Sequence, residues 1–183
     1  MKPKKCRCGC GVMFTPRNSM QIAATPECAI AIAKTKKARE VKQQEKVARK
    51  AVSEARNAIK TLSEWRKDAQ AVVNRYVRLR DEGLPCISCG RFHQGQYHAG
   101  HYLSRGAHPE LALDERNIHK QCQPCNTHLS GNQINYRKGL IERRGIELVE
   151  WLEGPHEPKK YTIADLQKII AEYKEKIKAI GKK

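Results

Sequence analysis

The sequence has few of the side chains that fill a large aromatic core. Aromatic residues make up only 5% of its 183 positions, with two Trp and two Phe. The longest apolar run covers residues 28–33, far short of the roughly 20 residues that cross a bilayer. No apolar segment of secretory-signal length follows the basic first residues. We therefore expect a soluble, intracellular protein of the cytoplasm with no membrane partner.

Acidic residues are also scarce. The chain has 19 Asp and Glu against 36 Lys and Arg, a formal net charge of +17. Such a surplus predicts a polyanionic partner, with nucleic acid the leading candidate. The excess is uneven, because residues 34–60 hold ten basic and three acidic residues while residues 86–132 are nearly balanced. We expect phosphate binding and chemistry to lie in different parts of the chain.

Glycine and proline are absent between Pro26 and Gly83, the longest stretch open to a helix. Residues 34–60 are rich in good helix formers and lack an apolar stripe, which favours a solvated basic helix. Its candidate phosphate-binding residues are Lys42, Lys46, Arg49 and Lys50; the alternative is that these charges only maintain solubility. Residues 65–79 place apolar side chains at helical spacing, so this part should pack on a core. A helix of this length could also pair in a homodimer.

Local sequence patterns predict two more helices toward the end of the chain. Residues 146–152 resemble a short helix, and Thr162 with Asp165 resembles a capping box that begins a final amphipathic helix. We divide the chain into a cysteine-containing segment (1–33), a basic helical arm (34–83), a core (84–137) and a C-terminal helical region (138–183).

Residues 86–132 hold four of the eight cysteines and six of the seven histidines. Two Cys-x-x-Cys pairs, Cys86 with Cys89 and Cys122 with Cys125, can together bind one tetrahedral Zn²⁺. Four thiolates leave no open position for water, so this zinc is expected to be structural. Disulfides are the alternative, which a cytosolic location disfavours. The 32 residues between the pairs are rich in imidazole, which suits a hydrolytic site.

The order of these motifs resembles a known family. Cys125-Asn126 resembles the endonuclease VII type of phage resolvase, within the HNH, or ββα-metal, nucleases. The whole set is more similar to the NinG (Rap) recombination endonucleases of lambdoid phages. The motifs are Leu84-Pro-Cys-Ile-Ser-Cys-Gly90, Ala99-Gly-His-Tyr102, Asn117-Ile-His-Lys-Gln-Cys122, Cys125-Asn126 and Ser130-Gly-Asn132.

The resemblance implies an α+β fold with a zinc-stapled ββα-metal (HNH-like) core flanked by long basic α-helices. It implies strands around residues 97–102 and 117–121, and a helix that begins at Asn126. His101 would be the general base that activates water, and Asn117 would fix the loop that orients it. Asn126 would bind a catalytic Mg²⁺ or Mn²⁺, and His119 would lie near the phosphate.

The resemblance implies cleavage of branched DNA of the Holliday-junction or D-loop type during phage recombination, in the bacterial host cytoplasm. One departure concerns His98, which stands where relatives carry Asp. Either His98 replaces a carboxylate ligand of the catalytic cation, or the site tolerates an altered set of ligands. The alternative function is a non-enzymatic, zinc-organised nucleic-acid-binding protein in which the His98 substitution has silenced the site.

A second cysteine cluster lies near the start of the chain. Cys6, Cys8, Cys10 and Cys28 suffice in number for a second zinc, although Cys-x-Cys-x-Cys spacing is atypical.

Overall fold

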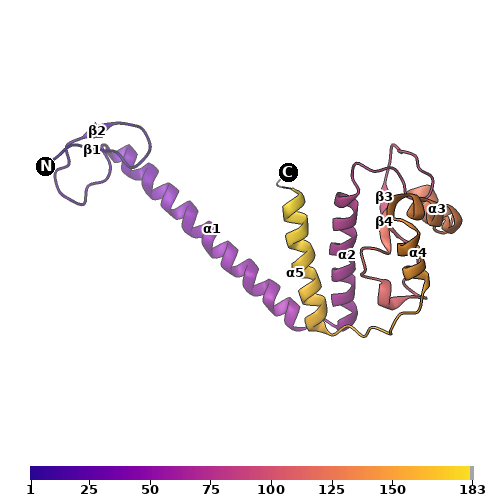
Figure 1. Ribbon diagram of the computed structural model, residues 1–183. Coiled ribbons are helices and arrows are strands. Elements are labelled where there is room, and N and C mark those ends of the chain that lie inside the picture. The colour runs from indigo at the N-terminus through magenta and orange to yellow at the C-terminus, as the bar shows by residue number, and fades with distance from the viewer. Residues whose placement is uncertain (182–183) are drawn as a thin grey trace. The chain divides into compact units, whose positions relative to one another are not determined.

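The computed structural model describes residues 1–181, which form two compact units, Met1–Lys60 and a second that begins at Thr61. The fold is mixed α+β and mostly helical, with two small two-stranded sheets (Figure 1). Among these residues, no helix is both long enough and apolar enough to cross a membrane.

The first unit joins a small hairpin to a long helix. Strands β1 (Lys4–Lys5) and β2 (Met13–Phe14) pair antiparallel, and α1 runs over Pro26–Ala58. The Thr25 side chain caps α1 by accepting from the backbone N–H of Cys28. Proline at the first helical position costs nothing, since its missing N–H would be unbonded there anyway. No residue of α1 is buried, as expected for a solvated basic helix.

The helical stretch expected to run uninterrupted to residue 82 is divided in two. Helix α1 ends at Ala58 and α2 (Leu62–Arg80) begins after Thr61. The Thr61 hydroxyl accepts from the Glu64 N–H at 3.3 Å, and the Glu64 carboxylate accepts from the Thr61 N–H at 2.8 Å. This capping box satisfies N–H groups that a continuous helix would bond internally, so it starts a new helix without Gly or Pro.

In the second unit α2 lies beside α5 (Ile163–Ile180), as Figure 1 shows. The capping box predicted for Thr162 and Asp165 begins α5, as expected. The apolar faces of these helices form one hydrophobic core with residues of the strand region: Trp65, Ala69, Val73, Val77, Leu113, Ile118, Tyr161, Leu166, Ile170 and Tyr173.

The second sheet supports the candidate site. Strands β3 (Tyr97–His101) and β4 (Ile118–Cys122) pair antiparallel close to the predicted ranges, and the register places His98 opposite Gln121 and Gly100 opposite His119. Ile118 on one face belongs to the α2–α5 core. The other face meets α3 (Gln133–Arg144), and a second core lies between α3 and α4 (Ile146–Glu153).

The segment after β4 differs from the expected helix at Asn126. Asn126 lies inside a single π-helical turn, Pro124–His128, and α3 begins only at Gln133. Ser130, Gly131 and Asn132 have φ angles of 48°, 91° and 47°, so the backbone is left-handed between the two helices. Three such residues cannot continue a right-handed helix, and the expectation for Asn126 as the first helical residue was wrong.

The end of α2 is anchored to β4. Asp81, directly after the helix, accepts from the Lys120 N–H at 3.0 Å and pairs with Arg80 at 2.7 Å. Arg80 also donates to the carbonyls of Glu115 and Ile118. Burial alone would raise the pKa of Asp81, but the Arg80 guanidinium offsets burial and lowers it. This clamp fixes β4 relative to the core helices.

Candidate metal centres and nuclease site

The structure brings Cys86, Cys89, Cys122 and Cys125 together. Their Sγ atoms all lie within 4.8 Å of one another, and the Sγ atoms of Cys89 and Cys122 are 3.9 Å apart. Thiolates about 2.3 Å from a tetrahedral Zn²⁺ lie about 3.8 Å from each other, so the cluster fits zinc. All four are free thiols, and no disulfide joins any cysteine of residues 1–181.

Hydrogen bonds around this cluster favour thiolates. The Cys122 N–H donates to Cys86 Sγ and the Asn132 amide donates to Cys125 Sγ, both at 3.4 Å. Burial alone would raise the pKa of the Cys89 thiol, but the His93 ring, 3.1 Å away, and nearby backbone groups lower it to about 6. The net shift is the opposite at Cys122 and Cys125, where burial raises the pKa, so the thiolate form that binds metal is favoured at Cys89 and not at these two.

The N-terminal cysteines form a second cluster of the same kind. Cys6, Cys8 and Cys10 lie in the turn between β1 and β2, and Cys28 lies in the first turn of α1. Their Sγ atoms lie within 4.8 Å of one another, so this cluster could also bind zinc. Hydrogen bonds from the backbone of Cys8 and Ala24 lower the pKa of Cys6 to about 6.

His101 lies at the end of β3 with its ring fixed by a backbone group. Its Nε2 is 3.0 Å from the carbonyl oxygen of Ala112. A carbonyl can only accept, so Nε2 carries the proton and Nδ1 keeps a free lone pair. Burial lowers the pKa of His101. The ring is therefore neutral near pH 7 and can accept a proton at Nδ1.

Asn117 closes the loop between the two strands. Its Oδ1 accepts from the Leu103 N–H at 2.8 Å, and its Nδ2 donates to the carbonyls of Leu103 and Leu111 at 3.0 and 3.2 Å. The side chain is fully buried. Since the loop it holds includes Ala112, Asn117 acts on His101 indirectly, through the carbonyl that orients the ring.

His98 and His119 share the other face of the sheet. Alternation along β3 places His98 and His101 on opposite faces, whereas His98 and His119 lie on the same face of adjacent strands. The Nε2 atoms of His98 and His119 are buried without a hydrogen-bond partner in residues 1–181. Such atoms call for a water or an ion that the protein does not itself supply.

The protonation of His119 is set by Tyr136 of α3. The Tyr136 hydroxyl donates to the Gly100 carbonyl at 2.9 Å, so its oxygen accepts from His119 Nδ1 at 3.2 Å. Burial lowers the pKa of His119 to about 3. His119 is thus neutral with a bare lone pair on Nε2, the form that binds metals. His119 is almost fully buried, with 1% of its surface exposed, and its expected position near the phosphate stays a prediction.

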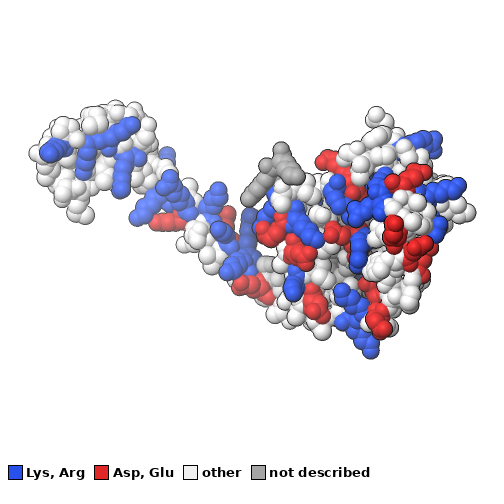
Figure 2. Space-filling model, viewed as in Figure 1, with Lys and Arg blue, Asp and Glu red and all other residues white. Residues whose placement is uncertain are grey.

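The basic residues predicted to hold phosphate lie on α1. Lys42, Lys46, Arg49 and Lys50 are all exposed, and over α1 the blue side chains of Figure 2 outnumber the red ones. Lys50 pairs loosely with Glu54 at 3.7 Å.

Two contributors were missed from the sequence. Tyr136 fixes His119, and the Gln70 amide lies 3.4 Å from His101 Nε2. Neither position stands out in the sequence, because each depends on a contact between distant segments.

Comparison with known proteins agrees with the resemblance. The family model described as "Bacteriophage Lambda NinG protein" matches residues 1–183. Proteins named "Protein ninG" from Salmonella phage P22 and Escherichia phage lambda are 50% and 49% identical over 114 residues, which is 62% of this chain and 56% of each relative. The relative from Escherichia phage 933W is 48% identical over 57% of its length. The matched segment thus spans little more than half of these relatives. No solved structure matches the chain.

Proposed function

This chain belongs to the bacteriophage Lambda NinG family, and from that premise we propose that it is a metal-dependent endonuclease that cuts branched DNA at recombination intermediates. The observation that carries the proposal is the environment of the His101 ring. The Ala112 carbonyl holds Nε2 in its protonated form, and burial keeps the ring neutral, so Nδ1 is available as a general base.

The reaction is hydrolysis of a phosphodiester. His101 Nδ1 takes a proton from water as the water oxygen bonds to phosphorus, and the bond from phosphorus to the 3′ oxygen breaks. The products are a 5′ phosphate and a 3′ hydroxyl, which gains its proton from solvent. Asn117 keeps the base in place by holding the loop that carries Ala112.

A divalent cation, Mg²⁺ or Mn²⁺, would stabilise the charge on the phosphate and the leaving oxygen. We propose His98, His119 and Asn126 as its ligands; the partnerless Nε2 atoms of His98 and His119, on the sheet face opposite His101, support the two histidines. Imidazole favours Mn²⁺ over Mg²⁺, which prefers oxygen. Replacing His98 with Asp adds an oxygen ligand and is expected to shift the preference toward Mg²⁺.

Affinity for DNA would come largely from the basic helix α1. At 1.5 Å per residue, its 33 residues span about 50 Å, enough to follow one arm of a duplex or junction. Its Lys and Arg can neutralise phosphates but cannot read sequence, which suits an enzyme that selects DNA by structure. Two cuts are needed to resolve a junction, so a homodimer is part of the proposal.

The deciding experiment is nicking of a four-way junction and of a linear duplex by the purified protein, with Mg²⁺ or Mn²⁺ added. We expect metal-dependent cleavage of the junction, its loss in His101→Ala, and its retention in the matched control His156→Ala. His156 is outside the sheet and contacts Trp151 and the Leu152 carbonyl.

A second function has one observation in its favour, the imidazole of His98 where the resemblance expects a carboxylate. In that case the protein binds nucleic acid without cutting it. Binding of the junction with no cleavage in either metal, and no gain of cleavage in His98→Asp, would favour this alternative.

A further inference from the structure

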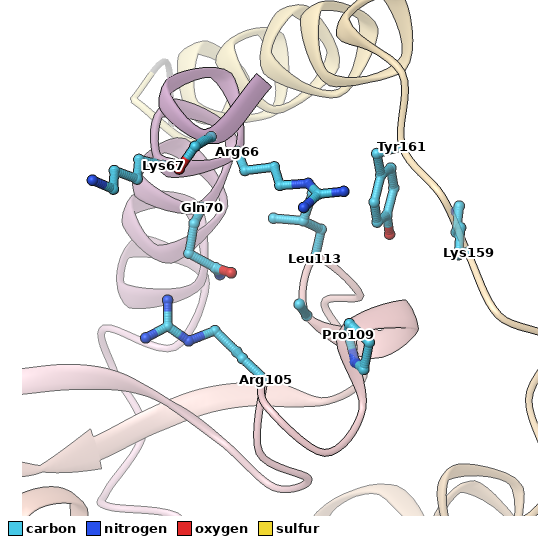
Figure 3. A pocket seen from close by; sticks show the side chains of 10 residues that line it. Arg66, Lys67, Gln70, Arg105, Pro109, Leu113, Lys159 and Tyr161 are labelled. Atoms are coloured by element: carbon cyan, nitrogen blue, oxygen red, sulfur yellow. The ribbon is translucent and has the colours of Figure 1, made fainter. Parts of the chain in front are cut away.

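A basic pocket that the proposed reaction does not use lies beside His101. It is a cavity of about 280 Å³ in the second unit. Four cationic side chains line it, and Asp and Glu are absent from the lining (Figure 3); the cations are Arg66, Lys67, Arg105 and Lys159. A concave site with four positive charges and no carboxylate selects an anion.

Three separate segments build this pocket. Ser63, Arg66, Lys67 and Gln70 form one face of α2, with the spacing of adjacent helical turns. Arg105 comes from the loop after β3, and Lys159 and Tyr161 precede α5. Figure 3 shows Arg66 reaching from α2 toward Leu113 and Tyr161, whereas Arg105 reaches from its loop toward α2 on the side of Gln70 and Lys67 is directed outward.

The two arginines are available to a ligand. No ion pair among residues 1–181 uses Arg66 or Arg105, whereas Arg80, Arg116 and Arg137 each pair with a carboxylate. Arginine presents a planar set of N–H donors that matches the oxygens of a phosphate. Two guanidinium groups that line one cavity and have no carboxylate partner therefore favour an anion such as a phosphate over a neutral ligand.

The pocket adjoins the proposed general base. Gln70 and Ala112 both line the pocket, and both contact His101 Nε2, at 3.4 and 3.0 Å. Gln70 is 8% exposed, so its amide forms the inner wall between the cavity and the imidazole. A phosphate held there would be a near neighbour of His101 but on the Nε2 side, away from the lone pair on Nδ1.

We propose that this pocket binds one backbone phosphate of the DNA, adjacent along the strand to the phosphodiester that His101 attacks. The position of this phosphate next to the attacked phosphodiester rests on the proposed function. Binding of a phosphate in the pocket does not. The volume is at or below the roughly 300–1,000 Å³ of pockets for drug-sized ligands, which suits one phosphate with its sugar. Arg66 and Arg105 are then positioning residues that set which bond reaches the base.

The test compares two doubly substituted full-length proteins. Arg66→Gln with Arg105→Gln removes two pocket charges. Arg75→Gln with Arg78→Gln removes two exposed arginines from α2 that do not line the pocket. We measure junction binding by fluorescence anisotropy across a salt series. Thermal unfolding verifies that both variants fold.

The pocket variant should bind the junction about tenfold or more weakly than the control, as expected for loss of a charge-assisted contact. Its slope of log affinity against log salt should be shallower by about 0.9, one phosphate contact. In cleavage, KM should rise more than kcat falls, because the contact exists before and during the reaction. Equal affinity and slope in the two variants would overturn the proposal.

Two further results distinguish this proposal from the nuclease proposal and from binding of a free anion. If the native protein never cuts DNA but the pocket variant still loses affinity and slope, the phosphate pocket stands and the nuclease proposal fails. Titration with inorganic phosphate, followed by NMR, tests a free anion as the occupant. Tight phosphate binding abolished by the pocket substitutions, with DNA affinity unchanged, would overturn the assignment to DNA.

Discussion

Tyr136→Phe tests how the sheet face beneath the candidate cation site is held together. The hydroxyl is fully buried and serves two groups, the Gly100 carbonyl at 2.9 Å and His119 Nδ1 at 3.2 Å. Removing it leaves both buried groups without this partner. At about 1–3 kcal/mol for each of the two buried groups left unsatisfied, the free energy of unfolding should fall by at least about 2 kcal/mol.

The matched control is Tyr102→Phe, whose ring centroid lies 5.4 Å from that of Tyr136. The Tyr102 hydroxyl donates to Glu153, which Arg137 also binds at 2.8 Å and whose side chain is 36% exposed. Because the carboxylate keeps its other partner and reaches water, this change should cost no more than about 1 kcal/mol. For a domain of this size the two melting temperatures should differ by about 5–10 °C.

The same substitution should weaken cation binding. Without Tyr136, the proton of His119 is no longer held on Nδ1, and loss of such an outer partner typically costs about 10–100-fold in metal affinity. The measurements are thermal unfolding of both variants and the Mn²⁺ concentration that gives half-maximal nicking. Equal melting temperatures would refute the account of the buried hydroxyl. An unchanged Mn²⁺ midpoint in a folded Tyr136→Phe protein would remove His119 from the ligand set.

Five other outcomes are expected. Cys122→Ser should lose one bound zinc and unfold the segment of residues 86–132, because the metal joins ligands distant in sequence; undiminished zinc in elemental analysis, with unchanged thermal stability, would contradict this. His101→Ala should abolish nicking while DNA affinity and zinc content stay near those of the native protein. In the native protein kcat should rise with pH through a midpoint below pH 6.5, since a base must be neutral and burial lowers the pKa of His101; a midpoint above pH 6.5 would indicate another group. Gly139→Ala should destabilise the fold by about 1–3 kcal/mol, since the added Cβ would overlap the Ile87 carbonyl oxygen and push α3 from the zinc cluster; equal denaturation midpoints would show that the site relaxes. Gln at the four basic positions of α1 should weaken DNA binding and flatten its salt dependence by about 0.9 per lost contact; an unchanged slope would leave that helix a solubilising role. The four positions are Lys42, Lys46, Arg49 and Lys50.

The sequence predicted best what is encoded locally. Cys-x-x-Cys spacing fixes two thiols on one turn, so the cluster of Cys86, Cys89, Cys122 and Cys125 could be expected before its Sγ atoms were seen together. The Thr162–Asp165 cap is equally local, and it begins α5 where expected. The similar cap of Thr61 and Glu64 is equally local, but the absence of Gly and Pro predicts one continuous helix there, and the cap divides it.

The sequence was least informative about contacts that depend on the face of the strand that a side chain occupies. His98 and His101 are three residues apart, so an extended strand separates them onto opposite faces. His119 is buried because Tyr136 and α3 cover its face, a contact between segments 17 residues apart. The pocket of Arg66, Arg105 and Lys159 combines positions about 40 and 50 residues apart and carries no linear motif. Only the folded chain brings such groups together.

Under the proposed nuclease function, the distribution of charge and of candidate site residues predicts that DNA affinity and catalysis are separable. The exposed cations of α1 belong to the first unit, whereas His101, Asn117 and the partnerless imidazoles of His98 and His119 belong to the second. Groups that share no partners make nearly additive contributions to free energy. Loss of charge on α1 combined with His101→Ala should therefore show the affinity of the first change and the rate of the second. The pocket of Arg66 and Arg105 is the exception, because Gln70 and Ala112 join it to His101. Coupling between affinity and rate is thus expected at the pocket and not on α1.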